Sequence, residues 1–447
     1  MTRRPTIRPT RPAARAALAA ALAATPVLAQ DTSSPQEVRR PNPIDLVRPD
    51  APELAHPGPY AVGVTTMDFV RSGVPDVRRA TATSQPTYDR PLTVEVWYPA
   101  ADGTTGGGTY ETVLRDGETP VTLSGSAVRE AAPMGGETFP LVIVSHGYPG
   151  NRFLMSPLAE TLASRGYVVA SIDHTDSTYS DQGAFGSTLL NRPRDQLFVL
   201  DAMAGLSDGI GEITDGDTAA VVGYSMGGYG ALIFAGAGVT EASTTFDYAP
   251  PGGLLAANQA GTEARAELDD PRLKAAVAFA PWGNNAGFFD AEGLAGIDIP
   301  LLLIAGSADD VSGYEAIRGI FDSTTGTDRA LLTFENANHN AGAPMPAPAE
   351  SWAWSETLGW PPFEHYADPV WDSVRMNNIA AHFVSAFLDR ELKGAETDLY
   401  LDLVPVAADG VWSVTEDGLR TGAHTYWLGF PERTAAGLRF ETRAAGE

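Results

Sequence analysis

Cysteine is absent from this chain of 447 residues, and lysine is nearly absent. The missing thiols exclude a disulfide framework, a cysteine nucleophile and a lipid-modified cysteine. The 30 basic residues are all arginine except Lys274 and Lys393, and 56 acidic residues outnumber them, which gives a formal charge of −26. Because such an acidic surface repels a phosphate backbone, we expect no nucleic-acid partner.

Long apolar runs are also missing beyond the first thirty residues. Residues 1–29 combine five arginines, an Ala/Leu run over residues 16–24 and the small-residue ending Val27-Leu28-Ala29. This three-part pattern is typical of a secretory signal peptide, although a disordered basic arm is the alternative interpretation. We therefore expect a secreted or periplasmic protein without stable membrane insertion.

Strand-like and helix-like segments alternate along the middle of the chain. Apolar runs at 139–145, 167–172, 219–222, 273–280 and 300–305 are separated by helix-like stretches. Strands that are apolar on both faces and separated by helices predict an α/β fold, with a mostly parallel central sheet and helices on both faces.

The remaining composition divides the chain into parts. Residues 30–58 are rich in proline and charge and are expected to form a linker or surface arm. We expect a catalytic domain at 59–393 with two inserts, 238–270 and an aromatic, lid-like one at 341–371. The strand-prone tail, 394–447, is expected to add a small β extension.

The most specific motif is Gly223-Tyr224-Ser225-Met226-Gly227. It follows a short apolar run and precedes a stretch of small, helix-forming residues, which is the strand–turn–helix context of a G-x-S-x-G nucleophile elbow. The motif predicts Ser225 as a nucleophile. The alternative is a glycine-rich turn with a solvated serine.

A serine nucleophile needs a base, and the base needs an orienting acid. Asp309 and His339 each follow the end of a predicted strand, and the order Ser, Asp, His is the one used by this architecture. His339 is therefore the predicted base, since the other six histidines lie in the linker, the aromatic insert, a helix or the tail, or precede Ser225. Asp309 is favoured over its neighbour Asp310 as the acid.

The turn after the strand at 139–145 contains candidate oxyanion donors. The backbone N–H of Tyr148, together with that of Met226, is predicted to form the oxyanion hole. The cluster Asp173-His174-Thr175-Asp176 lacks zinc-like spacing and is interpreted as a hydrogen-bonded loop instead of a metal site. We expect neither a metal nor an organic cofactor.

With these motifs the chain resembles the α/β-hydrolase superfamily over residues 59–393. Ser145-His146-Gly147, the run 158–170 and Asp173-His174 are similar to predicted dienelactone hydrolases and platelet-activating-factor acetylhydrolase-like proteins, although a true dienelactone hydrolase uses cysteine. Tyr148, Ser225-Met226 and Ala280-Pro281-Trp282 are similar to bacterial cutinases and polyester hydrolases. The second resemblance implies that Tyr148 and Trp282 clamp an acyl or aromatic ring of the substrate.

These features predict an exported serine carboxylesterase that acts on short-chain or aryl esters through an acyl-enzyme. The substrate would be a small or polymeric ester, and a polyester hydrolase or phospholipid acetylhydrolase is the alternative within the class. An amidase or peptidase, or a non-catalytic binding protein on the same scaffold, is the alternative from another class. The oligomeric state is left open.

Overall fold

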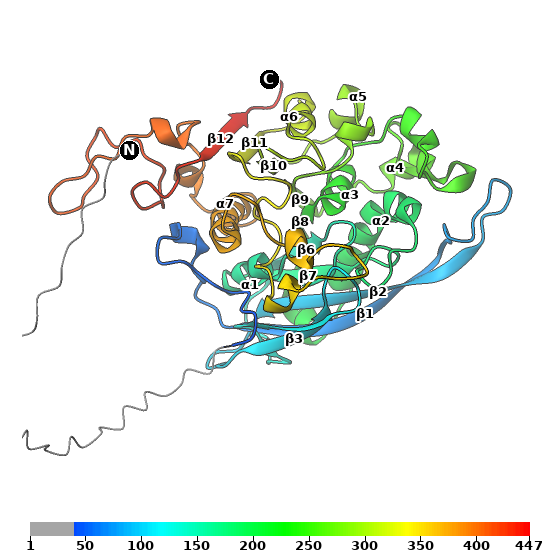
Figure 1. The fold of residues 1–447 in the computed structure, drawn as a ribbon, viewed down its shortest axis with the longest axis horizontal. Coiled ribbons are helices and arrows are strands. Elements are labelled where there is room, and N and C mark those ends of the chain that lie inside the picture. The colour runs from blue at the N-terminus through cyan, green and yellow to red at the C-terminus, as the bar shows by residue number, and fades with distance from the viewer. Residues whose placement is uncertain (1–39) are drawn as a thin grey trace, which may run out of the picture. The chain divides into compact units, whose positions relative to one another are not determined.

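A ten-stranded sheet runs through the computed structural model, which describes residues 40–447 as one compact unit (Figure 1). The predicted signal peptide and residues 30–39 of the predicted linker lie outside the described residues. The strand order in the sheet is β12-β11-β10-β9-β8-β6-β7-β2-β1-β5. The strands are β1 (Val62–Pro75), β2 (Thr87–Pro99), β5 (Val128–Arg129), β6 (Phe139–Ser145), β7 (Val168–Asp173), β8 (Thr214–Tyr224), β9 (Leu273–Phe279), β10 (Leu301–Gly306), β11 (Arg329–Phe334) and β12 (Leu438–Arg443).

The central strands from β7 to β11 pair in parallel, whereas β1, β2 and β12 join antiparallel. Every residue of β10 and β11 is buried, because helices cover both faces of this part of the sheet. The parallel arrangement brings the carboxyl ends of β6, β8, β10 and β11 to one edge, where ligand sites of open α/β sheets are found.

Helices cover the two faces of the sheet. In Figure 1, α1 (Ser156–Ser164) and α7 (Ser373–Lys393) lie on one side, and α2 (Phe185–Ala204) and α3 (Met226–Phe234) lie on the other. Helix α6 (Tyr314–Ser323) connects β10 to β11, and α4 (Glu263–Ala266) and α5 (Ala291–Leu294) are single turns. Helix α7 begins where the Asp372 side chain accepts the Arg375 N–H and ends at Gly394, whose φ is 63°.

A separate hairpin and an extended arm complete the amino-terminal half. Strands β3 (Gly108–Val113) and β4 (Pro120–Gly125) pair with each other as a small antiparallel sheet. Residues 40–58 lie along the domain, where the turn η1 (Glu53–Ala55) contacts α7 and the Leu54 N–H donates to His382 Nδ1 at 3.1 Å.

The tail differs from the small β extension expected from its composition. Residues 394–447 contain one strand of the main sheet, β12, which pairs with β11, and the rest is irregular. The irregular part is anchored by Trp427, whose indole N–H donates to the Val404 carbonyl at 2.8 Å and whose ring contacts Phe383 of α7. The β part of the tail is therefore one strand that extends the central sheet, and strand propensity alone does not specify which strand it joins.

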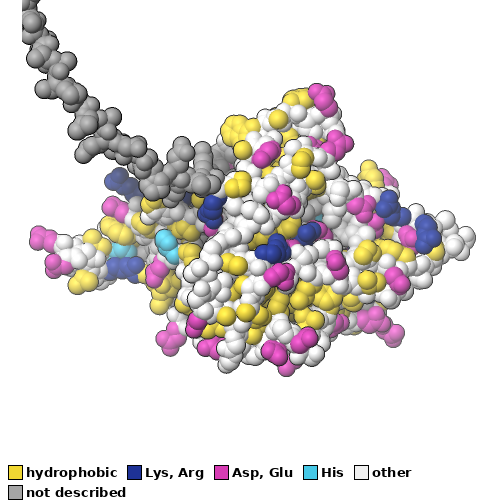
Figure 2. All heavy atoms as spheres, turned by 90° about the horizontal axis from the view of Figure 1, so that it is seen from below, with side chains coloured by type: hydrophobic (Ala, Val, Ile, Leu, Met, Phe, Trp, Pro, Cys, Tyr) yellow, Lys and Arg dark blue, Asp and Glu magenta, His cyan; other side chains and the backbone are white. Residues whose placement is uncertain are grey.

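The surface follows the acidic composition. Figure 2 shows Asp and Glu side chains spread over the face in view, between apolar patches. Within residues 40–447, none of the helices combines the length and the hydropathy that crossing a membrane requires.

Candidate active site

Ser225 lies in a strained turn between β8 and α3. Its φ of 55° and ψ of −113° are unfavourable for a residue with a side chain, and the surrounding packing must hold them. A Cβ at Gly223 would collide with the Gly227 carbonyl, and one at Gly227 would collide with the Ser145 carbonyl. Both glycines of the motif are therefore required by close backbone contacts, and the serine is lifted from the sheet edge as the motif predicts.

The structure brings Ser225, His339 and Asp309 into one hydrogen-bonded chain. The Ser225 hydroxyl lies 2.9 Å from His339 Nε2, and His339 Nδ1 lies 2.9 Å from Asp309 Oδ2. Asp309 follows β10 and His339 follows β11, so neighbouring strand ends converge on the nucleophile. With Nδ1 protonated, Nε2 is free to accept the serine proton.

Asp309, and not Asp310, is hydrogen-bonded to His339. Asp309 Oδ1 also accepts the backbone N–H groups of Val311 at 2.9 Å and Ser312 at 2.8 Å. Burial raises the pKa of the Asp309 carboxyl, but the hydrogen bond and charge of His339 and the two N–H groups outweigh burial, so the pKa lies below its ordinary value. Asp310 is exposed at the mouth of the cavity next to Ser225.

Two backbone N–H groups are available to an oxyanion beside Ser225. Within residues 40–447, neither the Tyr148 nor the Met226 N–H has a hydrogen-bond partner. A Cβ at Gly147 would lie 3.3 Å from Ser225 Cβ, so the loop that carries Tyr148 approaches the nucleophile closely. Free donors at this position match the predicted oxyanion hole.

Two residues that were not predicted to belong to the site, His146 and Arg192, hold the loop that carries Tyr148 through hydrogen bonds. His146 Nδ1–H donates to the Gly147 carbonyl at 2.7 Å, and His146 Nε2 accepts the His174 N–H at 3.2 Å. Arg192 of α2 donates to the His146 carbonyl at 2.6 Å, and burial lowers the pKa of its guanidinium to about 9. These contacts hold the Gly147–Tyr148 peptide in place next to Ser225. No local pattern marks Arg192, because it stands in the polar run from Asn191 to Gln196 of α2.

The Asp173–Asp176 loop is extensively hydrogen-bonded. The Ser145 hydroxyl lies 2.9 Å from His174 Nε2, and His174 Nδ1 lies 3.1 Å from Asp195 Oδ2. Asp195 also accepts a fork of hydrogen bonds from Arg90, at 2.9 Å from Nη2 and 3.0 Å from Nε. All four side chains are at most 1% exposed.

A cavity of about 620 Å³ opens at Ser225 and His339. The insert 341–371 covers part of it with Trp360, Phe363 and His365, and the turn after β3 contributes Arg115. The rings of Phe363 and Trp352 lie 4.5 Å apart, which continues the apolar wall outward to an indole that is 67% exposed. The aromatic insert therefore lines this cavity.

Trp282 does not line this cavity. The backbone N–H of Trp282 donates to the Ser225 carbonyl at 3.2 Å, and the Trp282 ring packs against the Phe288 ring with their centroids 5.1 Å apart. Phe185, at the start of α2, contacts both the Tyr148 ring at 5.1 Å and the Trp282 ring at 5.5 Å, edge to face in each case. A substrate ring clamped between Tyr148 and Trp282, as the resemblance to polyester hydrolases implies, would first have to displace Phe185.

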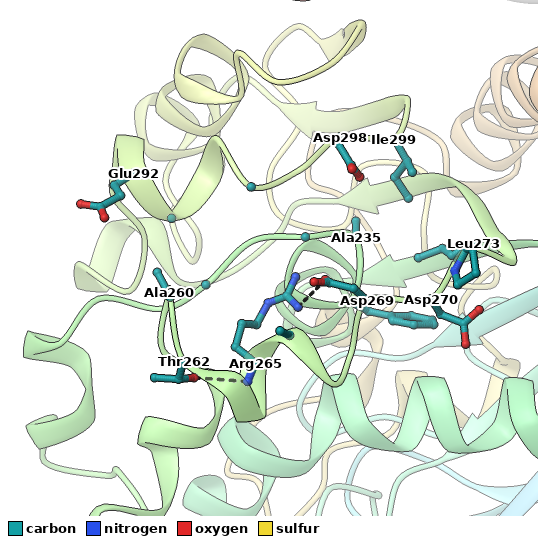
Figure 3. A pocket seen from close by; sticks show the side chains of 18 of the residues that line it. Ala235, Ala260, Thr262, Arg265, Asp269, Asp270, Leu273, Glu292, Asp298 and Ile299 are labelled. Atoms are coloured by element: carbon teal, nitrogen blue, oxygen red, sulfur yellow. Dashed lines mark hydrogen bonds and ion pairs between the residues drawn. The ribbon is translucent and has the colours of Figure 1, made fainter.

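A larger hollow of about 960 Å³ lies at the opposite edge of the sheet, near the beginnings of β9 and β10 (Figure 3). Its most buried polar side chain is Arg265, which donates to Asp269 Oδ1 at 2.7 Å. Neither serine nor histidine occurs among the described residues that line it. The chemistry is therefore concentrated in the smaller cavity.

The chain is similar to several known proteins. Residues 55–193 match the family described as platelet-activating factor acetylhydrolase, isoform II, a segment that includes Tyr148 and ends before Ser225. A segment of 211 residues is 28% identical to cutinase est1 of Thermobifida alba and covers 47% of this chain and 56% of that protein. Another, of 204 residues, is 26% identical to a bis(hydroxyethyl) terephthalate hydrolase of Streptomyces coelicolor, with coverages of 45% and 51%. The chain thus spans about half the length of the curated relatives it matches.

A solved structure extends the likeness to most of the chain. The ferulic acid esterase from Streptomyces cinnamoneus superimposes with a TM-score of 0.52 at 21% identity, over 79% of this chain and 94% of that one. Together with the sheet order, this confirms the predicted α/β-hydrolase fold. The predicted resemblance to acetylhydrolase-like proteins and cutinases is likewise confirmed.

Proposed function

We propose that this protein is an exported serine carboxylesterase that hydrolyses short-chain or aryl carboxylic esters. The observation that supports it most is the hydrogen-bonded chain from Ser225 through His339 to Asp309 at a cavity with two free backbone N–H groups. The cutinase and terephthalate-ester hydrolase relatives support an ester as the substrate.

In the proposed mechanism the Ser225 hydroxyl attacks the ester carbonyl while His339 Nε2 accepts its proton. The Tyr148 and Met226 N–H groups bind the oxyanion of the tetrahedral intermediate, and donors of this kind are typically worth about a hundredfold or more in rate each. His339 then gives the proton to the departing alcohol, and an acyl-enzyme forms on Ser225. Water, activated by the same histidine, releases the acid.

The covered cavity supports a small ester. Trp360 and Phe363 stand over part of the opening, and about 620 Å³ accommodates a short acyl or single-ring group. A polyester chain is the second candidate, because Trp352 and Trp354 of the same insert are 67% and 61% exposed and offer an apolar approach to the site. Export is supported by the three-part pattern of residues 1–29.

The test is hydrolysis of 4-nitrophenyl esters from acetate to palmitate by the protein lacking residues 1–29 and by Ser225→Ala. We expect turnover that is fastest on short chains and is lost in the variant. Rates that rise steadily toward palmitate would contradict the small-ester proposal. No turnover by a folded wild-type protein would favour the amidase or binding-protein interpretation.

A further inference from the structure

The active-site cavity contains one arginine that forms no ion pair with any carboxylate in the described part of the chain. Arg115 lies in the turn between β3 and β4 and lines the cavity together with Ser225 and His339. Its only hydrogen bond within residues 40–447 is a long one, 3.5 Å from Nη1 to Gln182 Oε1, and no carboxylate there lies within ion-pair distance.

The acidic residues around the cavity do not neutralise Arg115. The carboxylate of Asp368 is occupied by the backbone N–H groups of Asn338 at 2.6 Å, Val370 at 2.8 Å and Trp371 at 2.7 Å. Asp310 and Glu364 are exposed to solvent at the rim. Arg115 therefore carries a positive charge in a cavity whose carboxylates either accept hydrogen bonds from other backbone N–H groups or are exposed to water.

This arrangement is unusual within the molecule, because other arginines away from solvent have strong partners. Arg90 forks onto Asp195, Arg152 pairs with Glu95 and Asp173, and Arg192 donates to a carbonyl. Arg115 is only partly exposed, and burial lowers the pKa of its guanidinium while leaving it charged at neutral pH. Holding a partly desolvated guanidinium without good hydrogen-bond acceptors is unfavourable unless a ligand supplies them.

We propose that Arg115 binds an anionic oxygen group of the substrate, so that the preferred ester carries a carboxylate or phosphate besides its ester bond. A guanidinium presents a planar fork of N–H donors that matches either group. The inference rests on the proposed esterase function, since it assigns the substrate class of that same cavity. Tyr148, whose hydroxyl donates to the Gln182 carbonyl at 3.2 Å, connects this corner of the cavity to the oxyanion loop.

The test compares matched charged and neutral esters. One pair, 4-nitrophenyl hydrogen glutarate and its methyl ester, carries the charge in the acyl part; 4-acetoxybenzoate and its methyl ester carry it in the alcohol part, and 4-acetoxyphenyl phosphate tests the phosphate. For at least one pair we expect the wild type to favour the anion about tenfold in kcat/KM, the size of a partly exposed charged hydrogen bond. Arg115→Gln should abolish this ratio, and Arg115→Lys should retain part of it.

The control variant is Arg420→Gln, which removes the same charge from an exposed position in the tail and should leave the ratio unchanged. A wild type that hydrolyses the neutral esters as well as all the charged ones, or a ratio that survives Arg115→Gln, would overturn the inference.

A binding measurement separates this inference from the proposed function. Calorimetry with Ser225→Ala and monomethyl glutarate, 4-hydroxybenzoate or phenyl phosphate should give an affinity that falls about tenfold when Arg115→Gln is added. Binding that depends on Arg115 without turnover of any ester by the wild type would reject the esterase and keep the anion site. Turnover of neutral esters with no binding of any of these anions would keep the esterase and reject the anion site.

Discussion

Two serine–histidine–aspartate chains lie in this molecule with nearly the same geometry. In the first, Ser225, His339 and Asp309 are joined by distances of 2.9 and 2.9 Å; in the second, Ser145, His174 and Asp195 are joined by 2.9 and 3.1 Å. Both chains connect the hydroxyl to Nε2 and the carboxylate to Nδ1. The hydrogen bonds alone therefore do not distinguish a catalytic group from a structural one.

The surroundings make the difference. The Ser225 chain opens on a cavity, its serine is at a strained turn, and the nearby Tyr148 and Met226 N–H groups have no partner among the described residues. The Ser145 chain is buried, and Arg90 holds its aspartate. We therefore expect catalysis at Ser225 and not at Ser145, because a nucleophile needs access to substrate and donors for the oxyanion as well as a base and an acid.

Removing the two hydroxyls should separate the two roles most strongly. Ser225→Ala is expected to lower kcat on a 4-nitrophenyl ester by at least about 10⁴-fold, because the nucleophile is lost. Ser145→Ala should keep most of the rate and instead lower the free energy of unfolding by about 1–3 kcal/mol, since His174 loses a buried partner. A fluorophosphonate label followed by peptide mapping checks this, and we expect it on Ser225. Modification of Ser145 would contradict the structural role given to Ser145.

Replacing the aspartate of the Ser225 chain should affect catalysis more than stability. Asp309→Asn is expected to lower kcat by about 10³–10⁴-fold with little change in stability, because the histidine is no longer held in the required tautomer. Steady-state kinetics and urea unfolding on the same preparations measure both quantities. A variant that keeps wild-type kcat would show that Asp310 or another group serves His339.

Asp195→Ala should act on stability. It leaves Arg90 buried without its main counterion, and the expected loss is about 3–5 kcal/mol in the free energy of unfolding. The paired replacement Arg90→Met with Asp195→Leu should recover part of that loss, because the buried guanidinium is removed together with its main counterion. Equal losses in the single and paired variants would indicate that packing, not charge, determines the effect.

A more gradual effect should appear in the pH dependence of stability. Burial lowers the pKa of His174 to about 3, against an ordinary value of 6.5. The unfolded chain then binds a proton that the folded protein does not, so this contribution is complete above pH 6.5 and is lost as the pH falls toward 3, at about 1.4 kcal/mol per pH unit. His174→Gln should make the curve of unfolding free energy against pH shallower by that amount, whereas His56→Gln, at an exposed position, should leave it unchanged. Equal slopes in wild type and His174→Gln would contradict the assignment.

Much of the architecture could be predicted because its signals are local. The glycines around Ser225 enforce their turn through contacts within a few residues, and apolar runs located β6, β7 and β9 to within about two residues, the usual uncertainty of an element's end. Asp309 and His339 follow from chain order and from strand ends that converge on one edge of a parallel sheet.

The rest depends on partners far apart in the chain. Arg90 and Asp195 are separated by 105 positions, and no local pattern shows that they meet. Phe185 is the first residue of α2, and its ring lies between Tyr148 and Trp282. The hydrophobic periodicity of a helix does not predict which distant rings its first residue will contact. The tail was strand-prone as expected, but which strand it would pair with depended on the open side of β11.

That pairing has a consequence for how the protein behaves in solution. Strand β11 is buried along its whole length, and without β12 its backbone N–H and C=O groups would form an open template for pairing with a second copy. Strand β12 instead presents Arg439, Glu441 and Arg443 at this border of the sheet. Charged edge strands are one means by which β proteins resist aggregation, so a protein truncated before Leu438 is expected to self-associate before it loses its chemistry.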